Sequence, residues 1–449
     1  MNQARLLDRL SQAGLPGPAA KRKAELFQQA SLQWERWGPG PPAEESRYFV
    51  PGRIEVLGKH TDYAGGRSLL CTVEQGFCVV ASPRPDPWVR VADAVRRQET
   101  QFLASADLDV VSNDWSVYPK TVARRIAKNF PGRLRGLDMV FASDLPSSAG
   151  LSSSSALVVA TFLALSKENN LDQHPAYRHN IRSREDLATY LGCVENGQTF
   201  GRLAGDVGVG TFGGSEDHTA ILCCRPGQLS QVRFCPVRLE RTVALPRDYV
   251  FVIGVSGVVA DKTGSAREKY NCASQAAKAI LEIWRTESGQ TEPTLLEAIV
   301  HSSDAPHRIR QALSQSSHSV YTAEALLERF AQFVDECIRI IPAAVDALER
   351  NDLVEFGKLV DGSQTSAELG LRNQVEETLH LVRSARQLGA TAASGFGAGF
   401  GGAVWAMVRS DQMEDFVANW KNSYHKRFPG LVNASDFILC RTGPSALCL

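Results

Sequence analysis

Apolar positions along this chain recur with two spacings, which predict strands in some segments and helices in others. Runs rich in β-branched and aromatic residues predict strands at 47–51, 68–81, 88–91, 249–255, 403–408 and 437–440. Apolar residues three or four apart predict helices at 5–36, 115–129, 155–170, 185–196, 266–286, 322–339, 343–350 and 375–388. Strands and helices therefore alternate early, and the second half is richer in helix.

The pattern is interrupted near residue 245. Pro236 and Pro246 precede the apolar run 249–255, which starts a new series of elements. The chain has 449 residues, enough to bury two cores. We therefore expect an α+β protein with domains at 1–245 and 246–449, and we allow that the final strands rejoin the first domain.

Composition narrows the class of protein. Lys+Arg and Asp+Glu both number 49, so nothing indicates a surface for nucleic acid. The longest apolar runs, 156–165 and 249–260, are too short to span a bilayer, and the first ten residues lack the apolar core of a signal peptide. Ten cysteines without a Cys-x-x-Cys pair favour reduced thiols. We expect a cytoplasmic protein without a nucleic-acid or membrane partner.

A serine- and glycine-rich stretch precedes the apolar segment 157–165. It reads Leu145-Pro-Ser-Ser-Ala-Gly-Leu-Ser-Ser-Ser-Ser-Ala156. The first N–H groups of a helix lack internal partners and carry the positive end of its dipole, so they favour an anion. An N-capped helix after a flexible turn would have the same composition. As a phosphate-binding loop, the stretch offers Ser148, Ala149, Gly150, Leu151, Ser152, Ser153, Ser154 and Ser155.

A second glycine-rich stretch, Gly395-Phe-Gly-Ala-Gly-Phe-Gly-Gly402, runs into the predicted strand 403–408. It has no Walker A lysine, and it enters a strand rather than the helix of a dinucleotide-binding turn. Glycines such as Gly397 and Gly399 allow the backbone to approach a ligand closely, although a tight turn alone would also use them.

A third stretch concentrates polar groups beside glycines. Pro51-Gly-Arg-Ile-Glu-Val-Leu-Gly-Lys-His-Thr-Asp-Tyr63 contains Arg53, Lys59, His60 and Asp62. Such side chains suit directed hydrogen bonds to hydroxyls and phosphate, although a solvated charged turn would have a similar composition.

Together, in this order, the three stretches resemble the motifs of the GHMP small-molecule kinases, which include galactokinase, homoserine kinase and mevalonate kinase. Residues 51–63 resemble the galactokinase signature, and the likeness covers about residues 45–410. It implies an N-terminal mixed sheet with helices, a C-terminal ferredoxin-like α+β domain and an active site in the cleft between them. It also implies ATP- and Mg²⁺-dependent phosphorylation of the C1 hydroxyl of galactose or a closely related sugar.

The resemblance also implies roles for single residues. Asp217 and Arg53 would be the catalytic pair, with Asp217 accepting or orienting the hydroxyl and Arg53 holding Asp217 ionised. Glu195 would bind Mg²⁺ together with Ser153 or Ser154. The remaining implied contacts are Lys59, His60, Asp62, Gly214 and Tyr270 to the sugar, and Trp115 to the nucleotide.

The chain departs from the family at several positions. Lys59 stands where galactokinases have a glutamate directed at the C6 side of the sugar. A sugar with a C6 carboxylate, galacturonate or glucuronate, or another non-galactose sugar is therefore an alternative substrate. Glu55 replaces an asparagine, and a turn at Gly58 could bring it back to neutralise Lys59. Residues 201–211 form a glycine-rich insert, which we expect beside the sugar site.

Two further hypotheses stay open. A kinase scaffold can lose catalysis and become a silent sugar sensor, although the presence of Arg53, Glu195 and Asp217 argues against this. Phosphorylation of mevalonate or homoserine is disfavoured by the polar cluster at 60–63. We expect a monomer or weak homodimer.

Overall fold

The computed structural model shows an α+β protein built on two sheets. It describes residues 2–37, 45–111, 114–146, 149–258, 265–397 and 399–449, with no side chains described for 265–270.

The helices differ greatly in length. They are α1 Gln3–Gln12, α2 Gly17–Glu35, η1 Asp62–Ala64, α3 Val117–Asn129, α4 Ser153–Glu168, η2 Leu171–Gln173, α5 Pro175–Asn180, α6 Arg184–Asn196, α7 Glu216–Cys223, α8 Ser265–Ser288, α9 Leu295–Val300, α10 Ala305–Gln315, α11 Ala323–Val334, the π-helical η3 Asp335–Ile340, α12 Ile341–Glu349, α13 Leu353–Gly370, α14 Glu376–Gln387, η4 Ser410–Gln412, α15 Met413–Arg427 and η5 Pro429–Leu431. The strands are β1 Ser46–Leu57, β2 Arg67–Pro83, β3 Trp88–Asp93, β4 Gln98–Leu103, β5 Leu137–Ser143, β6 Gln228–Arg233, β7 Arg238–Ala244, β8 Tyr249–Val255, β9 Ala392–Gly395, β10 Ala403–Arg409, β11 Asp436–Cys440 and β12 Leu447–Cys448.

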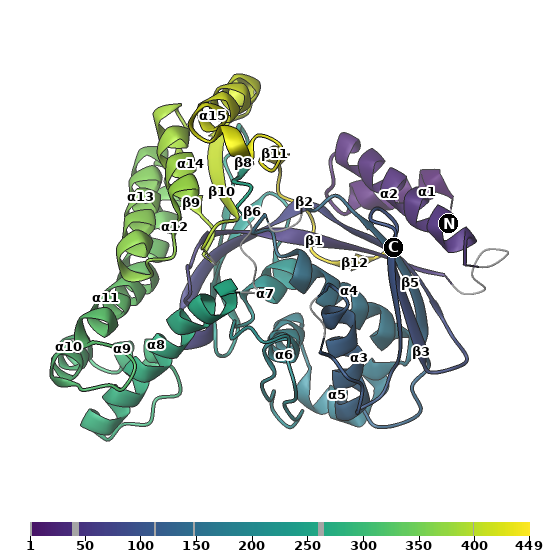
Figure 1. Ribbon diagram of the computed structural model, residues 1–449, viewed down its shortest axis with the longest axis horizontal. Helices are drawn as coiled ribbons and strands as arrows, with labels where there is room; N and C mark the ends of the chain where they lie inside the picture. The colour runs from purple at the N-terminus through teal and green to yellow at the C-terminus, as the bar shows by residue number, and fades with distance from the viewer. Residues whose placement is uncertain (1, 38–44, 112–113, 147–148, 259–264, 398) are drawn as a thin grey trace.

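The first sheet has the order β12-β1-β2-β5-β3-β4, with β6 and β7 attached beside β2. Its long strands are buried on both faces because alternate side chains meet different helices. Phe49 and Val80 pack with α1 and α2, whereas Tyr48 and Val79 belong to the core shared with α3, α4 and α6. Figure 1 shows these two helical layers above and below the strands.

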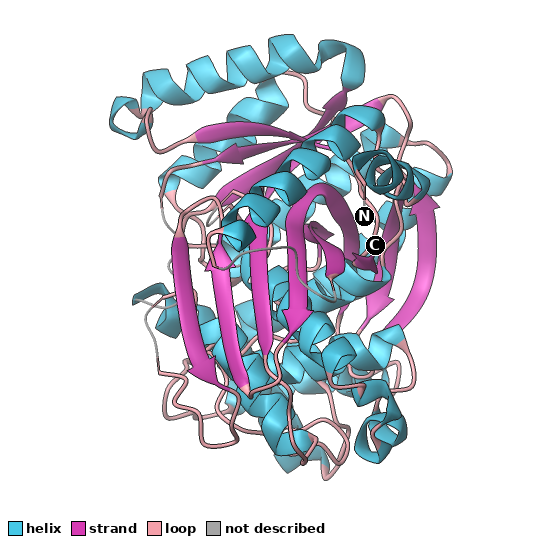
Figure 2. Ribbon diagram, turned by 90° about the vertical axis from the view of Figure 1, so that its right-hand side faces the viewer, coloured by secondary structure: helices cyan, strands magenta, loops and turns pink. Residues whose placement is uncertain are grey.

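The second sheet has the order β11-β8-β10-β9, with every neighbouring pair antiparallel. The chain passes from β8 through a helical segment to β9 and β10, and then through α15 to β11. This is the β-α-β-β-α-β connection of a ferredoxin-like unit, so the expected fold class is confirmed. Figure 2, which looks from the right-hand side of Figure 1, shows long strands of the first sheet side by side with helices against them.

The architecture places the three sequence motifs at element boundaries. Residues 51–63 run from β1 into η1, residues 145–156 connect β5 to α4, and residues 395–402 connect β9 to β10. Strand β12, close to the end of the chain, pairs with β1. Along the described ranges, no helix combines enough length with enough apolar character to cross a bilayer. All ten cysteines are unbridged.

Candidate active site

A cavity of about 60 Å³ lies where the three motifs approach one another. Its described lining is almost entirely polar or glycine, as expected for a site that holds a hydroxylated ligand. The lining residues are Arg53, Glu55, His60, Asp62, Ser155, Gly192, Glu195, Asn196, Thr211, Gly213, Gly214, Glu216, Asp217, His218 and Gly397.

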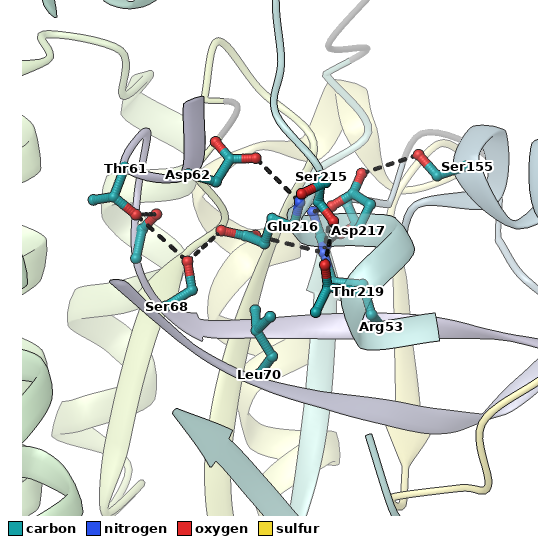
Figure 3. A network of polar contacts seen from close by, with 12 residues as sticks. Arg53, Thr61, Asp62, Ser68, Leu70, Ser155, Ser215, Glu216, Asp217 and Thr219 are labelled. Atoms are coloured by element: carbon teal, nitrogen blue, oxygen red, sulfur yellow. Dashed lines mark hydrogen bonds and ion pairs between the residues drawn. The ribbon is translucent and has the colours of Figure 1, made fainter. Parts of the chain in front are cut away.

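Arg53 and Asp217, the expected catalytic pair, form an ion pair in this wall. Arg53 Nε and Nη2 lie 2.7 and 2.6 Å from Asp217 Oδ1, and Nη1 donates to the carbonyl of Gly150 in the phosphate loop. Burial alone would lower the pKa of Arg53, but the carboxylates of Asp217, Glu216 and Glu55 raise it above its usual value. Arg53 therefore stays charged and fixes Asp217 toward the cavity (Figure 3).

Asp62 holds the start of α7, the helix that carries Asp217. Its carboxylate accepts a hydrogen bond from the backbone N–H of Tyr63 at 2.9 Å. It also accepts one from the backbone N–H of Glu216 at 3.1 Å (Figure 3). A methyl group on Gly214 would come within 2.4 Å of Asp62 Oδ2, so the close approach requires glycine. Burial raises the pKa of Asp62 despite these hydrogen bonds. His60 also lines the cavity, with Nδ1 3.0 Å from the hydroxyl of Tyr63.

The phosphate loop enters α4 through two residues in the left-handed region. Gly150 has φ +69° and Ser152 has φ +57°. The first turn of α4 receives no hydrogen bond from the Ser152 side chain, whose Oγ is buried without a partner among the described atoms. Free N–H groups and an unpaired hydroxyl suit the phosphates of ATP. Ala149 and Leu151 are buried beneath the loop, and Ser148 lies outside the described residues.

Glu195, the expected metal ligand, is contacted by a serine other than the two expected beside it. Ser155 Oγ lies 2.9 Å from Glu195 Oε2 and 3.2 Å from Asp217 Oδ2, whereas Ser153 and Ser154 have no contact with Glu195 among the described interactions. One carboxylate and one hydroxyl, completed by phosphates and waters, fit the coordination that Mg²⁺ prefers. The described residues contain no cluster of three His, Cys, Asp or Glu side chains that would form a complete protein cage.

The third motif closes the cavity from the second sheet. Gly397 lies against Glu55, because a methyl group there would approach both carboxylate oxygens to 2.7 Å. The loop is anchored by Gln364, which accepts from the N–H of Gly395 at 3.0 Å, and by Asn373, which donates to the carbonyl of Gly397 at 2.7 Å. Gly399, with φ +65°, packs on Asn373 instead of facing the cavity.

Lys59 is oriented differently from the sequence-based expectation. Its ammonium donates to Ser363 Oγ on α13 at 3.0 Å, its side chain is 1% exposed, and it is absent from the described cavity lining. Ser363 in turn donates to Glu336 at 3.0 Å. Burial lowers the pKa of Lys59, while Glu336 and Glu55 oppose that effect. The structure therefore places Lys59 outside the described cavity lining, with its ammonium directed at Ser363 of α13.

Trp115, Tyr270 and the insert 201–211 complete the set of expected site residues. Trp115 packs edge-on against Phe141 of β5, with ring centroids 5.8 Å apart, just before the phosphate loop begins. The side chain of Tyr270 lies outside the described part of the chain. The glycine-rich insert 201–211 does reach the cavity, where Thr211 contributes to the lining.

Several lining residues were not identified as site residues from the sequence. Glu216 stands directly before Asp217, and Glu55 is two positions from Arg53 on the same face of β1. His218 Nε2 lies 3.1 Å from Glu195 Oε2, although not aligned for a hydrogen bond. In the sequence, Glu55 stands out only as a departure from the family. Its spacing of two residues from Arg53, which puts both side chains on the same face of a strand, is the signal that identifies it as a lining residue.

Family models of known proteins match the segments that form this site. The chain matches the GHMP kinases N terminal domain over residues 117–214, the GHMP kinases C terminal domain over 344–426 and the galactokinase galactose-binding signature over 40–83. The two domain matches identify the class as the GHMP kinases. The relatives allow a narrower assignment.

The galactokinase of Roseiflexus sp. is 30% identical over 384 residues, covering 84% of this chain and 86% of that protein. The galactokinase of Chloroflexus aggregans is 29% identical over 427 residues, covering 93% and 96%. The crystal structure of Lactococcus lactis galactokinase complexed with galactose aligns with a TM-score of 0.76 at 21% identity, over 94% of this chain and 99% of that one, which supports the fold. The chain belongs to the galactokinase family, and it is a sugar kinase.

Proposed function

We propose that this kinase transfers the terminal phosphoryl group of ATP to the C1 hydroxyl of galactose or a closely related sugar. The observation that carries the proposal is the Arg53–Asp217 pair, which faces the same cavity as Gly397 and Ser155 at the start of the phosphate-loop helix. The galactokinase relatives and the galactose-binding signature support galactose as the acceptor.

In this reaction Asp217 orients the sugar hydroxyl and receives its proton, while Arg53 keeps the carboxylate in place and offsets charge on the transferring group. The phosphate loop holds the nucleotide through the N-terminus of α4 and the Ser152 hydroxyl. Glu195 and Ser155 would hold Mg²⁺, which when bound neutralises phosphate charge. Positioning and electrostatics then supply most of the rate enhancement.

The test is a coupled ADP assay with ATP, Mg²⁺ and a panel of sugars, with the phosphorylated carbon identified by NMR. Galactose should give a C1 phosphate. Asp217→Asn should lower kcat by about 10²- to 10⁴-fold while galactose still binds in calorimetry. Asp335→Asn, a half-buried aspartate paired with Arg339 on η3 and outside the described cavity lining, is the matched control and should retain activity.

Three results would contradict the proposal. Undiminished phosphorylation by Asp217→Asn would remove Asp217 from catalysis. Turnover of other sugars but not of galactose would change the substrate. Galactose binding without ADP formation would identify a silent sensor. Cytoplasmic location and a monomeric or weakly dimeric state stay predictions.

A further inference from the structure

Lys23 is a buried lysine of α2, and it lies before residue 40, where the first of the matched family segments begins. In α2, all of which the structure describes, it is the only buried residue with a charge, and it is 1% exposed. Its ammonium donates a hydrogen bond to Asp144 Oδ2 and lies 5.9 Å from the ring centroid of Phe49. A lysine buried this deeply needs an anion to balance its charge, and Asp144 supplies one.

Asp144 stands where the chain leaves the first sheet to form the phosphate loop. The ladder between β2 and β5 ends at the pair Phe77–Ser143. Gly76 and Asp144 are the next positions on the two sides of this ladder, and there the carboxylate takes the place of a backbone partner. Its Oδ1 accepts the N–H of Gly76 at 2.9 Å, while its Oδ2 accepts from Lys23. Residue 144 is therefore fixed to the sheet at the point where the backbone turns away from it.

The two ends of the phosphate loop meet at one glycine of β1. A methyl group on Gly52 would come within 2.5 Å of Leu145 Cδ2 and within 2.7 Å of the carbonyl oxygen of Leu151. The same carbonyl accepts the N–H of Arg53 at 3.2 Å. Leu145 directly follows Asp144, and Leu151 lies just before the first turn of α4, where the phosphates are expected. A shift of Asp144 would therefore reach the phosphate-binding end of the loop through this close packing.

We propose that Lys23 and Asp144 are positioning residues for the nucleotide, in which Lys23 orients the carboxylate that fixes the start of the phosphate loop. The inference rests on the proposed use of this loop for the phosphates of ATP. Figure 1 shows α2 and α4 on opposite sides of the first sheet, so the pair reaches the loop from behind the sheet. Well-packed apolar residues often stabilise a protein as much as a buried ion pair does, so stability by itself does not account for a lysine here. Orientation of Asp144 does account for it.

The test measures the KM for ATP and the KM for galactose separately in the ADP assay, together with urea unfolding. Lys23→Met should raise the KM for ATP about tenfold, because even a displacement of about 1 Å at a binding group weakens its contacts severely. The KM for galactose should stay within about twofold of wild type. A role in stability alone would lower the folded fraction, and hence the rate, without changing either KM.

A double variant tests whether Lys23 acts through Asp144. Asp144→Ala removes the carboxylate and should itself raise the KM for ATP by about tenfold or more. In that background Lys23→Met should change the KM by no more than about twofold, because the group that it orients is gone. Two full and independent increases would contradict an action through Asp144.

Arg84→Met is the matched control, because Arg84 makes an ion pair at the opposite end of the same strand. Its Nη1 lies 3.1 Å from Asp138 Oδ1 near the start of β5, whereas Asp144 directly follows the end of β5. Arg84→Met should lower the urea midpoint but leave the KM for ATP within about twofold of wild type. An equal rise in that KM for both variants would overturn the proposal, as would an unchanged KM in Lys23→Met.

If Lys23→Met does not fold, Asp144→Asn takes its place, since asparagine keeps an oxygen for the N–H of Gly76 and loses the charge that holds Lys23. A rise in the KM for ATP of more than about threefold would support the proposal, and a smaller change would overturn it. Failure of the proposed function is distinguished in the wild type. Wild-type protein that forms no ADP from ATP and galactose contradicts the function, whereas an active wild type with an unaltered KM in the variants contradicts only the positioning role.

Discussion

The hydroxyl of Ser155 lies 2.9 Å from the carboxylate of Glu195, and the same oxygen lies 3.2 Å from Asp217. Ser155 therefore links the candidate metal ligand on α6 to the candidate catalytic carboxylate on α7. Because it belongs to the first turn of α4, it also ties both groups to the phosphate loop.

Ser155→Ala should weaken Mg²⁺ dependence more than sugar binding. The loss of a hydrogen bond to a charged group should raise the Mg²⁺ concentration for half-maximal rate by about tenfold, with galactose affinity nearly unchanged. Ser166→Ala, on the same helix but away from the cavity lining described above, is the control. The same Mg²⁺ titration curve for Ser155→Ala and wild type would remove Ser155 from the metal site.

Gly214→Ala should impair sugar binding through Asp62. The added methyl group would lie 2.4 Å from Asp62 Oδ2 and 2.9 Å from the backbone N of Tyr63, so the carboxylate must move. We expect the KM for galactose to rise about tenfold, together with a stability loss of about 1–3 kcal/mol. Gly430→Ala serves as control because its methyl group would meet nothing within 4 Å. An unchanged KM would show that the position of Asp62 does not matter for the sugar.

Lys59→Met should destabilise the fold. The substitution removes a buried cation and leaves Glu336, which is 0% exposed, without it. Urea unfolding should show a loss of about 3–5 kcal/mol, much of which Lys59→Met/Glu336→Gln should recover. Lys278→Met, in an exposed pair with Glu282, should cost less than about 0.5 kcal/mol. Equal costs for the two lysines would argue against a buried charge network.

Asp206→Asn should reduce stability in a pH-dependent way. Asp206 anchors the insert 201–211 through hydrogen bonds from Arg124 at 2.8 and 3.2 Å, which lower the pKa of Asp206 below its usual value. The stabilisation is therefore fully present above about pH 4 and is lost as the pH falls through the folded-state pKa.

At pH 7 the expected cost of Asp206→Asn is about 1 kcal/mol, because asparagine keeps an oxygen that can accept from Arg124 and loses only the negative charge. Urea unfolding at pH 7 and at about pH 3 should show the difference from wild type shrinking in acid. The exposed Asp8→Asn should show little effect at either pH. A difference that does not depend on pH would refute the ionic role of Asp206.

The sequence was sufficient for elements with a strong local pattern. The apolar run 249–255 coincides with β8, and the glycine motif before 403 leads into β10 as expected. Helix α13 was not predicted, because Gly357, Gly362 and the polar segment 363–366 weaken its apolar pattern. Strands β6 and β7 were also missed, since they are short and rich in polar residues.

Side-chain direction at the site was harder to predict. Arg53 and Glu55 obey the alternation of a strand and face the same cavity. Lys59 does not, because Gly58 with φ +119° and His60 with φ +58° turn the chain out of the strand. Its partners Ser363 and Glu336 lie some 300 residues away in sequence, so no local pattern could place them beside it. The contact of Ser155 with Glu195 likewise depends on the packing of two helices, α4 and α6.

The pairing of β12 with β1 has a consequence for the order in which this protein folds. On the edge of β1 that faces away from β2, Tyr48 and Phe49 pair with Cys448 and Leu447. The segment before β12 also bonds to β2, where Glu74 N–H donates to the carbonyl of Arg441 at 2.9 Å. During synthesis β1 emerges early but must wait with one edge exposed until residues 441–448 have left the ribosome. Assembly of the strand that carries Arg53 is thus among the last steps, so truncated chains released before residue 441 would have an open edge ready for aggregation.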